Sequence, residues 1–292
     1  MRNLLLCVWS TLALAQGGLR YSIQVIEFEN KSGWHGQWEL GHAWDALLTD
    51  SLTQSGKFIV VADPEMRAAA MDEQDFAASG RTAGGNKAPQ TGQMTPSQLL
   101  VRGVIHQFDD GTSGGGAGAS YKGIGIKVKG GTALISGVIY VVDSTTCTVT
   151  ASHEFQQEMK LKGVGLSLSR HGFHGDVGGF KKTPAGEMMS KACDEATSFV
   201  VSQLDRIQWT GTVVKSGSKI IVNRGEREGV TKDMVFAVGE SEEIRDPDTG
   251  ELLYTDVTKS ATIKVVDVKE KIAICELVSG EAPIEGQTIF SN

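Results

Sequence analysis

The chain has 292 residues, of which 40% are hydrophobic and 22% are charged, and its formal net charge is -7. These values are typical of a folded protein with one or two domains, and the negative charge argues against a general nucleic-acid-binding role. Since no run of about 20 apolar residues occurs, any passage through a membrane would have to use strands rather than a helix.

The first fifteen residues, MRNLLLCVWSTLALA, have the order of a secretory signal. Arg2 precedes an apolar run from Leu4 to Leu14, and Ala13-Leu14-Ala15 forms an A-x-A cleavage site. A buried first strand is the less favoured interpretation. Three cysteines follow this segment, and an odd number of thiols allows at most one internal disulfide. Disulfides are therefore not expected to organise the fold.

Strand and helix patterns alternate from residue 21 to residue 204. Period-two alternation predicts strands at Tyr21–Asn30, at Phe58–Asp63, in LLVRGVIHQF and in LISGVIYVVDSTTCTVTASHEF. Helical spacing predicts a helix that ends before Gly56, a second that begins at Pro64, and a third over Ala185–Leu204. These elements predict an α+β fold, with an α/β-layered domain at residues 16–206 after the signal peptide at residues 1–15.

Helical patterns disappear after Trp209, and short strands separated by turns follow. This pattern predicts a second, all-β domain at residues 207–292, either a small barrel or a sandwich. The stretch DPDTGE, from Asp246 to Glu251, is expected to be a hairpin turn. A Ca²⁺ loop is the weaker alternative, because the further ligands of such a loop are missing.

Glycine accounts for 36 residues, and the excess lies in the segments 111–131 and 163–179. Gly114, Gly116 and Ala119 fit a G-x-G-x-x-A dinucleotide pattern, but that motif needs a helix to begin there. An alternating stretch, GIGIKVKGG, follows instead. A nucleotide site is therefore not expected.

Both glycine segments alternate apolar residues with small or polar ones, as the strands of a membrane barrel do. They predict two inserted hairpins, at about residues 112–131 and 153–182. The lipid-facing residues would be Ile124, Ile126, Val128, Val164, Leu166 and Leu168, and the pore-lumen residues Lys127, Lys129, Lys160 and Lys162. Two hairpins cannot close a barrel, so several copies would have to share one. Hairpins with one solvated face give the same alternation, and the pattern alone leaves both interpretations open.

Three stretches resemble the curli secretion channel family, the CsgG family. They are V-I-E-F-E-N-K-S-G at Val25–Gly33, S-G-K-F-I-V-V at Ser55–Val61, and S-G-G-G-A-G-A-S-Y-K-G-I-G-I from Ser113, which is followed by a strand that ends V-V-D-S-T-T. The third stretch is the most specific, because relatives that share the domain without forming pores lack the inserted hairpins. The resemblance covers about Tyr21–Leu204 and favours the membrane interpretation.

The resemblance implies an outer-membrane secretion channel with periplasmic domains, which exports unfolded polypeptide or another extended polymer. It implies a homo-oligomeric ring, typically a nonamer, whose partners are the secreted chain, outer-membrane lipid, and periplasmic and extracellular accessory proteins. In the family, a loop after the first strand narrows the channel. The corresponding loop here is SGWHGQWE, and the expected constriction residues are Trp34, His35, Gln37 and Trp38. The alternative is that Trp34 and Trp38 pack the domain.

Two features depart from the family. Its members are usually lipid-anchored through an N-terminal cysteine, whereas none follows the expected cleavage site, so membrane targeting would rest on the barrel. The added domain from Trp209 to Asn292 resembles the C-terminal domain of flagellar assembly protein T. This suggests a docking or ring-stabilising role and puts in doubt a curli subunit as the passenger.

Catalytic chemistry is not expected. No nucleophile–base–acid set is evident, and the HGFH pair, His171 and His174, lacks a third metal ligand. We therefore expect no catalytic residue, cofactor or metal site. The competing functional hypothesis is a soluble periplasmic scaffold or activator that binds cell-wall or flagellar-type ring machinery.

Overall fold

The computed structural model describes residues 18–35, 39–85, 88–110, 118–121, 124–127, 132–160, 177–250 and 252–291. The chain divides into two compact units. The first unit is Tyr21–Ile207, and the second joins the residues up to Arg20 to Gln208–Asn292.

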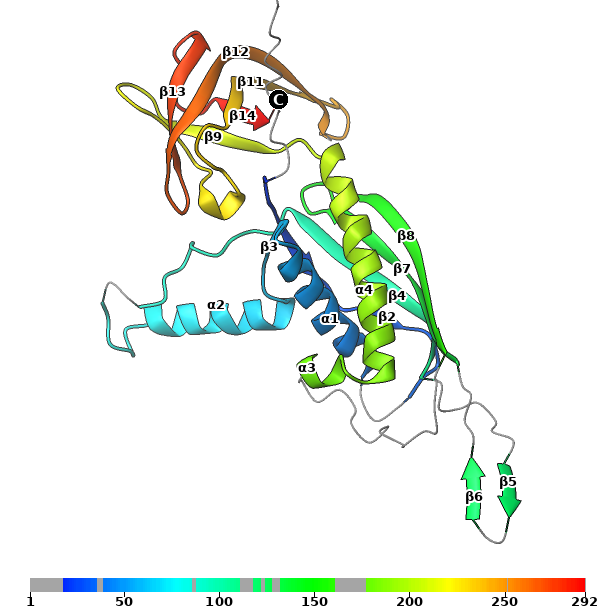
Figure 1. Cartoon of the computed structure of the whole chain (residues 1–292). Coiled ribbons are helices and arrows are strands. Elements are labelled where there is room, and N and C mark those ends of the chain that lie inside the picture. The colour runs from blue at the N-terminus through cyan, green and yellow to red at the C-terminus, as the bar shows by residue number, and fades with distance from the viewer. Residues whose placement is uncertain are drawn as a thin grey trace, which may run out of the picture. The chain divides into compact units, whose positions relative to one another are not determined.

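A mixed sheet with strand order β3-β1-β4-β7-β8 forms the first unit, and β2 also pairs with β4. Its strands are β1 (Tyr21–Val25), β2 (Glu29–Asn30), β3 (Phe58–Val60), β4 (Leu99–Asp109), β7 (Thr132–Asp143) and β8 (Val149–Lys160). β1 is parallel to β3 and β4, whereas β4, β7 and β8 form an antiparallel meander. Helices α1 (Leu40–Ser55) and α4 (Pro184–Gln203) pack against each other and cover one face of the sheet (Figure 1).

The core of this unit lies between the sheet and the two helices. Alternate residues of β7 are buried, as period two requires, and α1 buries residues at helical spacing. Trp44 of α1 is fully buried and stacks on Phe155 of β8, with ring centroids 4.5 Å apart. Gly56 ends α1 in the left-handed conformation with φ of 65°, as the sequence predicted.

Helix α2 (Pro64–Ala78) differs from the other long helices because none of its residues is buried. Asp63 caps it by accepting a hydrogen bond from the Met66 N–H at 2.8 Å, and Pro64 occupies its first turn. Met66, Met71 and Phe76 are 64%, 54% and 47% exposed. The N-terminal residues of the helix thus favour its formation, while its large apolar side chains are exposed to solvent.

The second unit is a closed barrel, which resolves the alternatives of barrel and sandwich that the sequence left open. The strand order is β10-β13-β12-β11-β14-β9. The strands are β9 (Thr210–Lys215), β10 (Ile220–Val222), β11 (Val235–Arg245), β12 (Leu252–Val268), β13 (Ala273–Gly280) and β14 (Thr288–Ser291). Short 3-10 helices, η1 (Leu204–Arg206) and η2 (Glu226–Glu228), lie in the first and second units. Asp246–Gly250 lie in the turn between the paired strands β11 and β12, where Asp246 Oδ1 accepts from the Asp248 N–H at 2.7 Å.

The first glycine segment contains an antiparallel hairpin of β5 (Gly118–Tyr121) and β6 (Ile124–Lys127), in which Tyr121 pairs with Ile124. Residues 161–176 of the second expected hairpin, 153–182, lie outside the described parts of the chain, so this hairpin stays a prediction. Residues 153–160 belong to β8, and Val177–Phe180 form the short helix α3. None of the helices among the described residues is both long and apolar enough to span a membrane.

The three cysteines in the described parts of the chain are free thiols. Cys147 is exposed in the turn between β7 and β8, whereas Cys193 and Cys275 are buried. Burial raises the pKa of the Cys275 thiol to about 12.

Candidate functional site

One end of the mixed sheet carries the roots of both glycine segments. β4 runs into the first segment and β7 returns from it, and Asp109 near the exit pairs with Leu134. Thr132, the first residue of β7, pairs with Lys160, the last residue of β8. The second segment therefore leaves from the strand next to β7. The ends of three adjacent strands, β4, β7 and β8, therefore lie together at this end of the sheet.

The loop after β2 starts beside the same part of β4. β2 pairs in parallel with β4, with Asn30 opposite Ile105, and the Lys31 N–H donates to the Ile105 carbonyl at 2.9 Å. Because β4 continues for only four residues beyond Ile105, the loop begins close to the root of the first glycine segment.

Residues 26–28 separate β1 from β2, and the contacts of Phe28 set the position at which β2 and the following loop begin. The Phe28 N–H donates to Asp45 Oδ1 of α1 at 3.2 Å, and its ring is 1% exposed. The ring lies against Gly103 of β4, where an added Cβ would come within 2.3 Å of Phe28 Cε1. Only glycine fits at this close approach. Burial raises the pKa of Asp45 to about 7; the Phe28 hydrogen bond opposes this shift, and nearby Glu27 adds to it.

Side chains of the loop fold it into a compact turn. Asn30 Oδ1 accepts from the Ser32 N–H at 3.0 Å and from Ser32 Oγ at 2.6 Å. Asn30 Nδ2 donates to the Trp34 carbonyl at 3.1 Å, and the Trp34 N–H donates to Ser32 Oγ at 3.2 Å. Such local bonds are the usual stabilisers of an asparagine-led turn.

Of the four expected constriction residues, Trp34 and His35 are described. The Trp34 ring is half-buried and meets Phe108 of β4 edge-to-face, with centroids 5.1 Å apart and an interplanar angle of 75°. The Trp34 ring thus takes part in the packing of its own unit, whereas His35 is exposed. Gln37 and Trp38 lie outside the described residues.

Only a few of the other expected pore residues are described. Lys160 is exposed at the end of β8. Ile124, Ile126 and Lys127 belong to β6, where Lys127 pairs with Gly118. The remaining residues lie outside the described parts of the chain: Lys129, Lys162, Val128, Val164, Leu166 and Leu168.

Sequence reasoning did not select Asn30, Ser32, Asp45 or Phe108. Asn30-Lys31-Ser32 has the composition of a side-chain-stabilised turn, and this signal could have identified the loop anchor. In the sequence, Phe108 is one of several apolar residues of a predicted strand, and nothing distinguishes it from the others. Its contact with Trp34 depends on the pairing of β2 with β4, which the sequence does not reveal.

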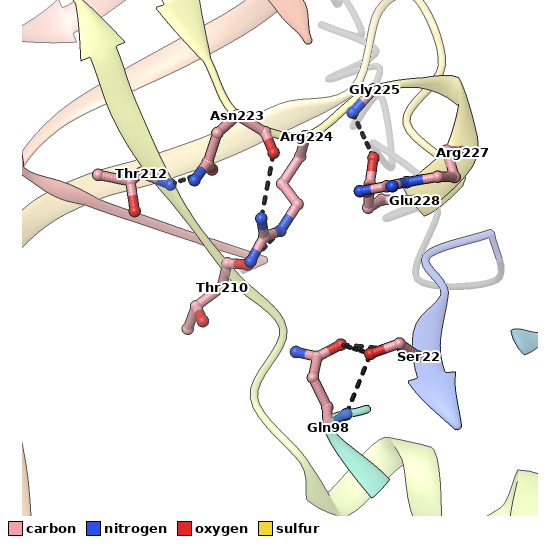
Figure 2. Close-up of polar contacts among 9 residues, drawn as sticks. All are labelled: Ser22, Gln98, Thr210, Thr212, Asn223, Arg224, Gly225, Arg227 and Glu228. Carbon is pink, nitrogen blue, oxygen red and sulfur yellow. Dashed lines mark hydrogen bonds and ion pairs between the residues drawn. The ribbon is translucent and has the colours of Figure 1, made fainter. Parts of the chain in front are cut away.

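Polar contacts hold the opposite end of β4 (Figure 2). The Gln98 N–H donates to Ser22 Oγ at 3.0 Å, and the Ser22 N–H donates to Gln98 Oε1 at 3.1 Å. Gln98 directly precedes β4, and Ser22 lies in β1. β4 is therefore fixed to β1 where it begins and contacts the loop after β2 where it ends.

A separate polar network stabilises the barrel unit (Figure 2). Arg224 donates through Nε to the Thr210 carbonyl at 2.9 Å and lies 5.9 Å from the Trp209 ring centroid. The buried carboxylate of Glu228 accepts from the Gly225 N–H at 2.9 Å and from Arg227 Nε at 2.7 Å. These contacts join residues of the barrel unit to one another and stabilise it.

Within the described residues, no three histidine, cysteine, aspartate or glutamate side chains form an arrangement that could hold a metal ion. His171 and His174 lie outside the described parts of the chain.

The sequence model of the family described as "Curli production assembly/transport component CsgG" matches residues 8–222. This range includes the whole first unit together with β9 and β10. No curated protein matches the sequence significantly.

Several solved structures are similar. Hypothetical protein CT253 from Chlamydia trachomatis is 16% identical, with a TM-score of 0.39 over 62% of this chain and 95% of that protein. The PelC dodecamer from Paraburkholderia phytofirmans is 10% identical, with a TM-score of 0.32 over 61% and 87%. Lipoprotein GNA1162 from Neisseria meningitidis is 14% identical, with a TM-score of 0.26 over 64% and 99%.

Proposed function

Because the chain belongs to the CsgG family of curli production assembly and transport components, we propose that it is a subunit of an oligomeric outer-membrane secretion channel. The channel would let unfolded polypeptide, or another extended polymer, pass outward without catalysis. The first unit would be periplasmic and the two glycine segments would enter the membrane.

The arrangement at one end of the mixed sheet is the observation that carries this proposal. Asp109, Thr132 and Lys160 mark neighbouring strand ends, and both glycine segments leave from them. Strands that continue from a sheet keep their backbone hydrogen bonds as they enter lipid, where no water can replace them. The sheet thus offers a suitable root for two barrel hairpins.

Oligomerisation follows from the same requirement. Two hairpins from one chain would leave unpaired strand edges in the hydrocarbon core, and each unsatisfied backbone group costs several kcal/mol there, on the order of the values for amide transfer. Neighbouring copies would pair these edges, and their loops after β2 would surround a common axis. The proposed assembly is therefore a closed homo-oligomeric ring.

The lysines of the first glycine segment give a residue-level test of the pore. If Ile124, Ile126 and Val128 face lipid, Lys127 and Lys129 face the lumen and favour acidic cargo. Replacing both lysines with Glu is expected to reverse the ion selectivity of the channel in planar bilayers. Unchanged selectivity would overturn this assignment of faces.

The proposal as a whole is tested by cell fractionation. The full chain, expressed with its N-terminal segment, is expected in the outer-membrane fraction as a ring that resists heating in detergent. Recovery of the chain as a water-soluble monomer would contradict the channel.

That outcome would favour a periplasmic scaffold, and one feature supports this second candidate. Helix α2 exposes Met66, Met71 and Phe76, and exposed apolar side chains on a helix are suited to docking on another protein. In the channel, the same helix and the added barrel unit would serve to contact accessory proteins or stabilise the ring.

A further inference from the structure

Trp34 and Phe108 are far apart in the sequence and meet edge-to-face, with ring centroids 5.1 Å apart. We propose that this pair is a latch through which the root of the first glycine segment holds the loop after β2 in place. Phe108 is then a positioning residue for the channel constriction. The inference rests on the channel function proposed above and adds how its narrowest part is held.

Hydrogen bonds shape the loop side of the latch up to Trp34. Both backbone polar groups of Trp34 are bonded, its carbonyl to Asn30 Nδ2 and its N–H to Ser32 Oγ. Asn30 itself belongs to β2 and pairs with β4. The Trp34 ring is therefore delivered to Phe108 by a bonded turn, while the next residue, His35, is exposed to solvent.

The strand side of the latch is equally well fixed. Phe108 is 6% exposed and pairs with Ile135 of β7, one residue before β4 ends. Ser22 and Gln98 hold the beginning of the same strand. A displacement of the strand end at the glycine segment therefore moves Phe108, and the contact transmits that movement to Trp34.

This geometry couples the barrel to the constriction. A loop held only by its own turn would keep its position whatever the inserted hairpin does. A loop latched to Phe108 follows the strand end, because packed aromatic rings adopt discrete arrangements rather than deforming continuously. Loss of either ring should release the loop and increase the time that the channel spends in wider, higher-conductance levels.

The test is a double-mutant cycle on the full-length protein, reconstituted in planar bilayers, with Trp34→Ala, Phe108→Ala and the double variant. Each single change is expected to increase the ratio of high- to low-conductance dwell times by about 2- to 10-fold, the range that corresponds to one aromatic pair. The double variant should show no larger effect than either single one, because both changes remove the same contact. Trp34→Phe keeps an aromatic ring at this position, so its ratio of dwell times should stay close to that of the wild type.

Phe76→Ala is the matched control, because this phenylalanine is exposed on α2 and should leave conductance unchanged. If Phe108→Ala does not fold, Trp34→Ala and Trp34→Phe carry the test, since the Trp34 ring is only half-buried. A conducting wild type whose single variants behave like it, or whose double variant shows the summed effect, overturns the latch alone. A wild type that never conducts overturns the channel and the latch together.

Discussion

The mixed sheet combines parallel and antiparallel strand pairs, whereas all strand pairs described in the C-terminal barrel are antiparallel, and the two units also differ at their edges. The barrel closes on itself through the order β10-β13-β12-β11-β14-β9. Among the described residues, the mixed sheet ends at β8, a strand of 12 residues with one neighbour. Closure removes unpaired edges, whereas an open sheet can be extended. The unit that can be continued into a larger assembly is therefore the one with the glycine segments.

The interiors of the two units show the same contrast. In the barrel, the buried carboxylate of Glu228 accepts hydrogen bonds from Gly225 and Arg227. The mixed unit has contacts of Phe28, Asn30 and Phe108 near the end of the sheet from which the glycine segments leave. The polar contacts described for the barrel lie within that unit, whereas those of the mixed unit include contacts of the loop after β2.

The largest expected effect is on stability, when a buried aromatic side chain is truncated in the core of one unit or the other. Trp44→Ala removes a fully buried ring from the mixed unit, and Phe236→Ala removes one from the barrel. Each should lower the free energy of unfolding of its own unit by about 3–5 kcal/mol. Urea unfolding followed by circular dichroism should show two transitions, of which each variant shifts one.

Trp44→Phe is the matched control for the mixed unit, because it keeps a ring for stacking on Phe155. A single transition that both alanine variants shift equally would mean that the two units unfold together.

A smaller but sharp effect is expected at the glycine that makes room for Phe28. At Gly103, a Cβ would lie 2.2 Å from the Val138 carbonyl oxygen, which belongs to the backbone. Gly103→Ala should therefore destabilise the mixed unit by about 1–3 kcal/mol through overpacking and leave the barrel transition in place. Gly84→Ala is the control, since nothing lies within 4 Å of its added Cβ. Equal stability of the two variants would contradict the close packing at Gly103.

The hydrogen bonds of Glu228 allow a corresponding test of the stability of the barrel. Glu228→Gln exchanges the buried carboxylate for an amide and weakens its bonds to Gly225 and Arg227. The free energy of unfolding of the barrel should fall by about 1–3 kcal/mol. Glu226→Gln, at an exposed neighbour, should change neither transition. An unchanged barrel in Glu228→Gln would show that the network contributes nothing to stability.

The smallest effect is a pH dependence of the mixed unit at Asp45. Its pKa of about 7 in the folded state lies above the ordinary value of 3.8, so the folded state binds the proton more tightly. Stability should therefore decrease as the pH rises from about 4 to about 7, by an amount that partial exposure to solvent reduces. Asp45→Asn should flatten this dependence in urea titrations at pH 5 and pH 7.5. A wild type whose mixed unit gains stability over the same interval would contradict the assignment.

Local signals in the sequence were sufficient for most elements of the mixed unit. Gly56 and Pro64 marked a helix end and a helix start correctly, and the apolar spacing located α4. Closure of the barrel depends on the pairing of β9 with β14, which lie far apart in the chain, so the sequence left the choice between barrel and sandwich open. Period-two alternation continues past Lys160 into residues that lie outside the described parts of the chain, so the bounds of the second hairpin stay a prediction.

The site was predicted less completely for the same physical reason. Aromatic residues in the loop after the first strand were selected on family resemblance, and nothing local indicated that Trp34 would meet Phe108. That contact arises from the parallel pairing of β2 with β4 after the break at Phe28. Long-range pairing of this kind is set by the whole sheet, not by any short stretch.

The most direct test of the channel is the ion conductance of the purified full-length chain in planar lipid bilayers. Discrete, reproducible current steps from a detergent-extracted oligomer are expected, and they should disappear when residues 111–131 are replaced by a short Gly-Ser linker. Absence of current steps from a correctly folded, membrane-extracted protein, or steps that persist in the linker variant, would contradict the account.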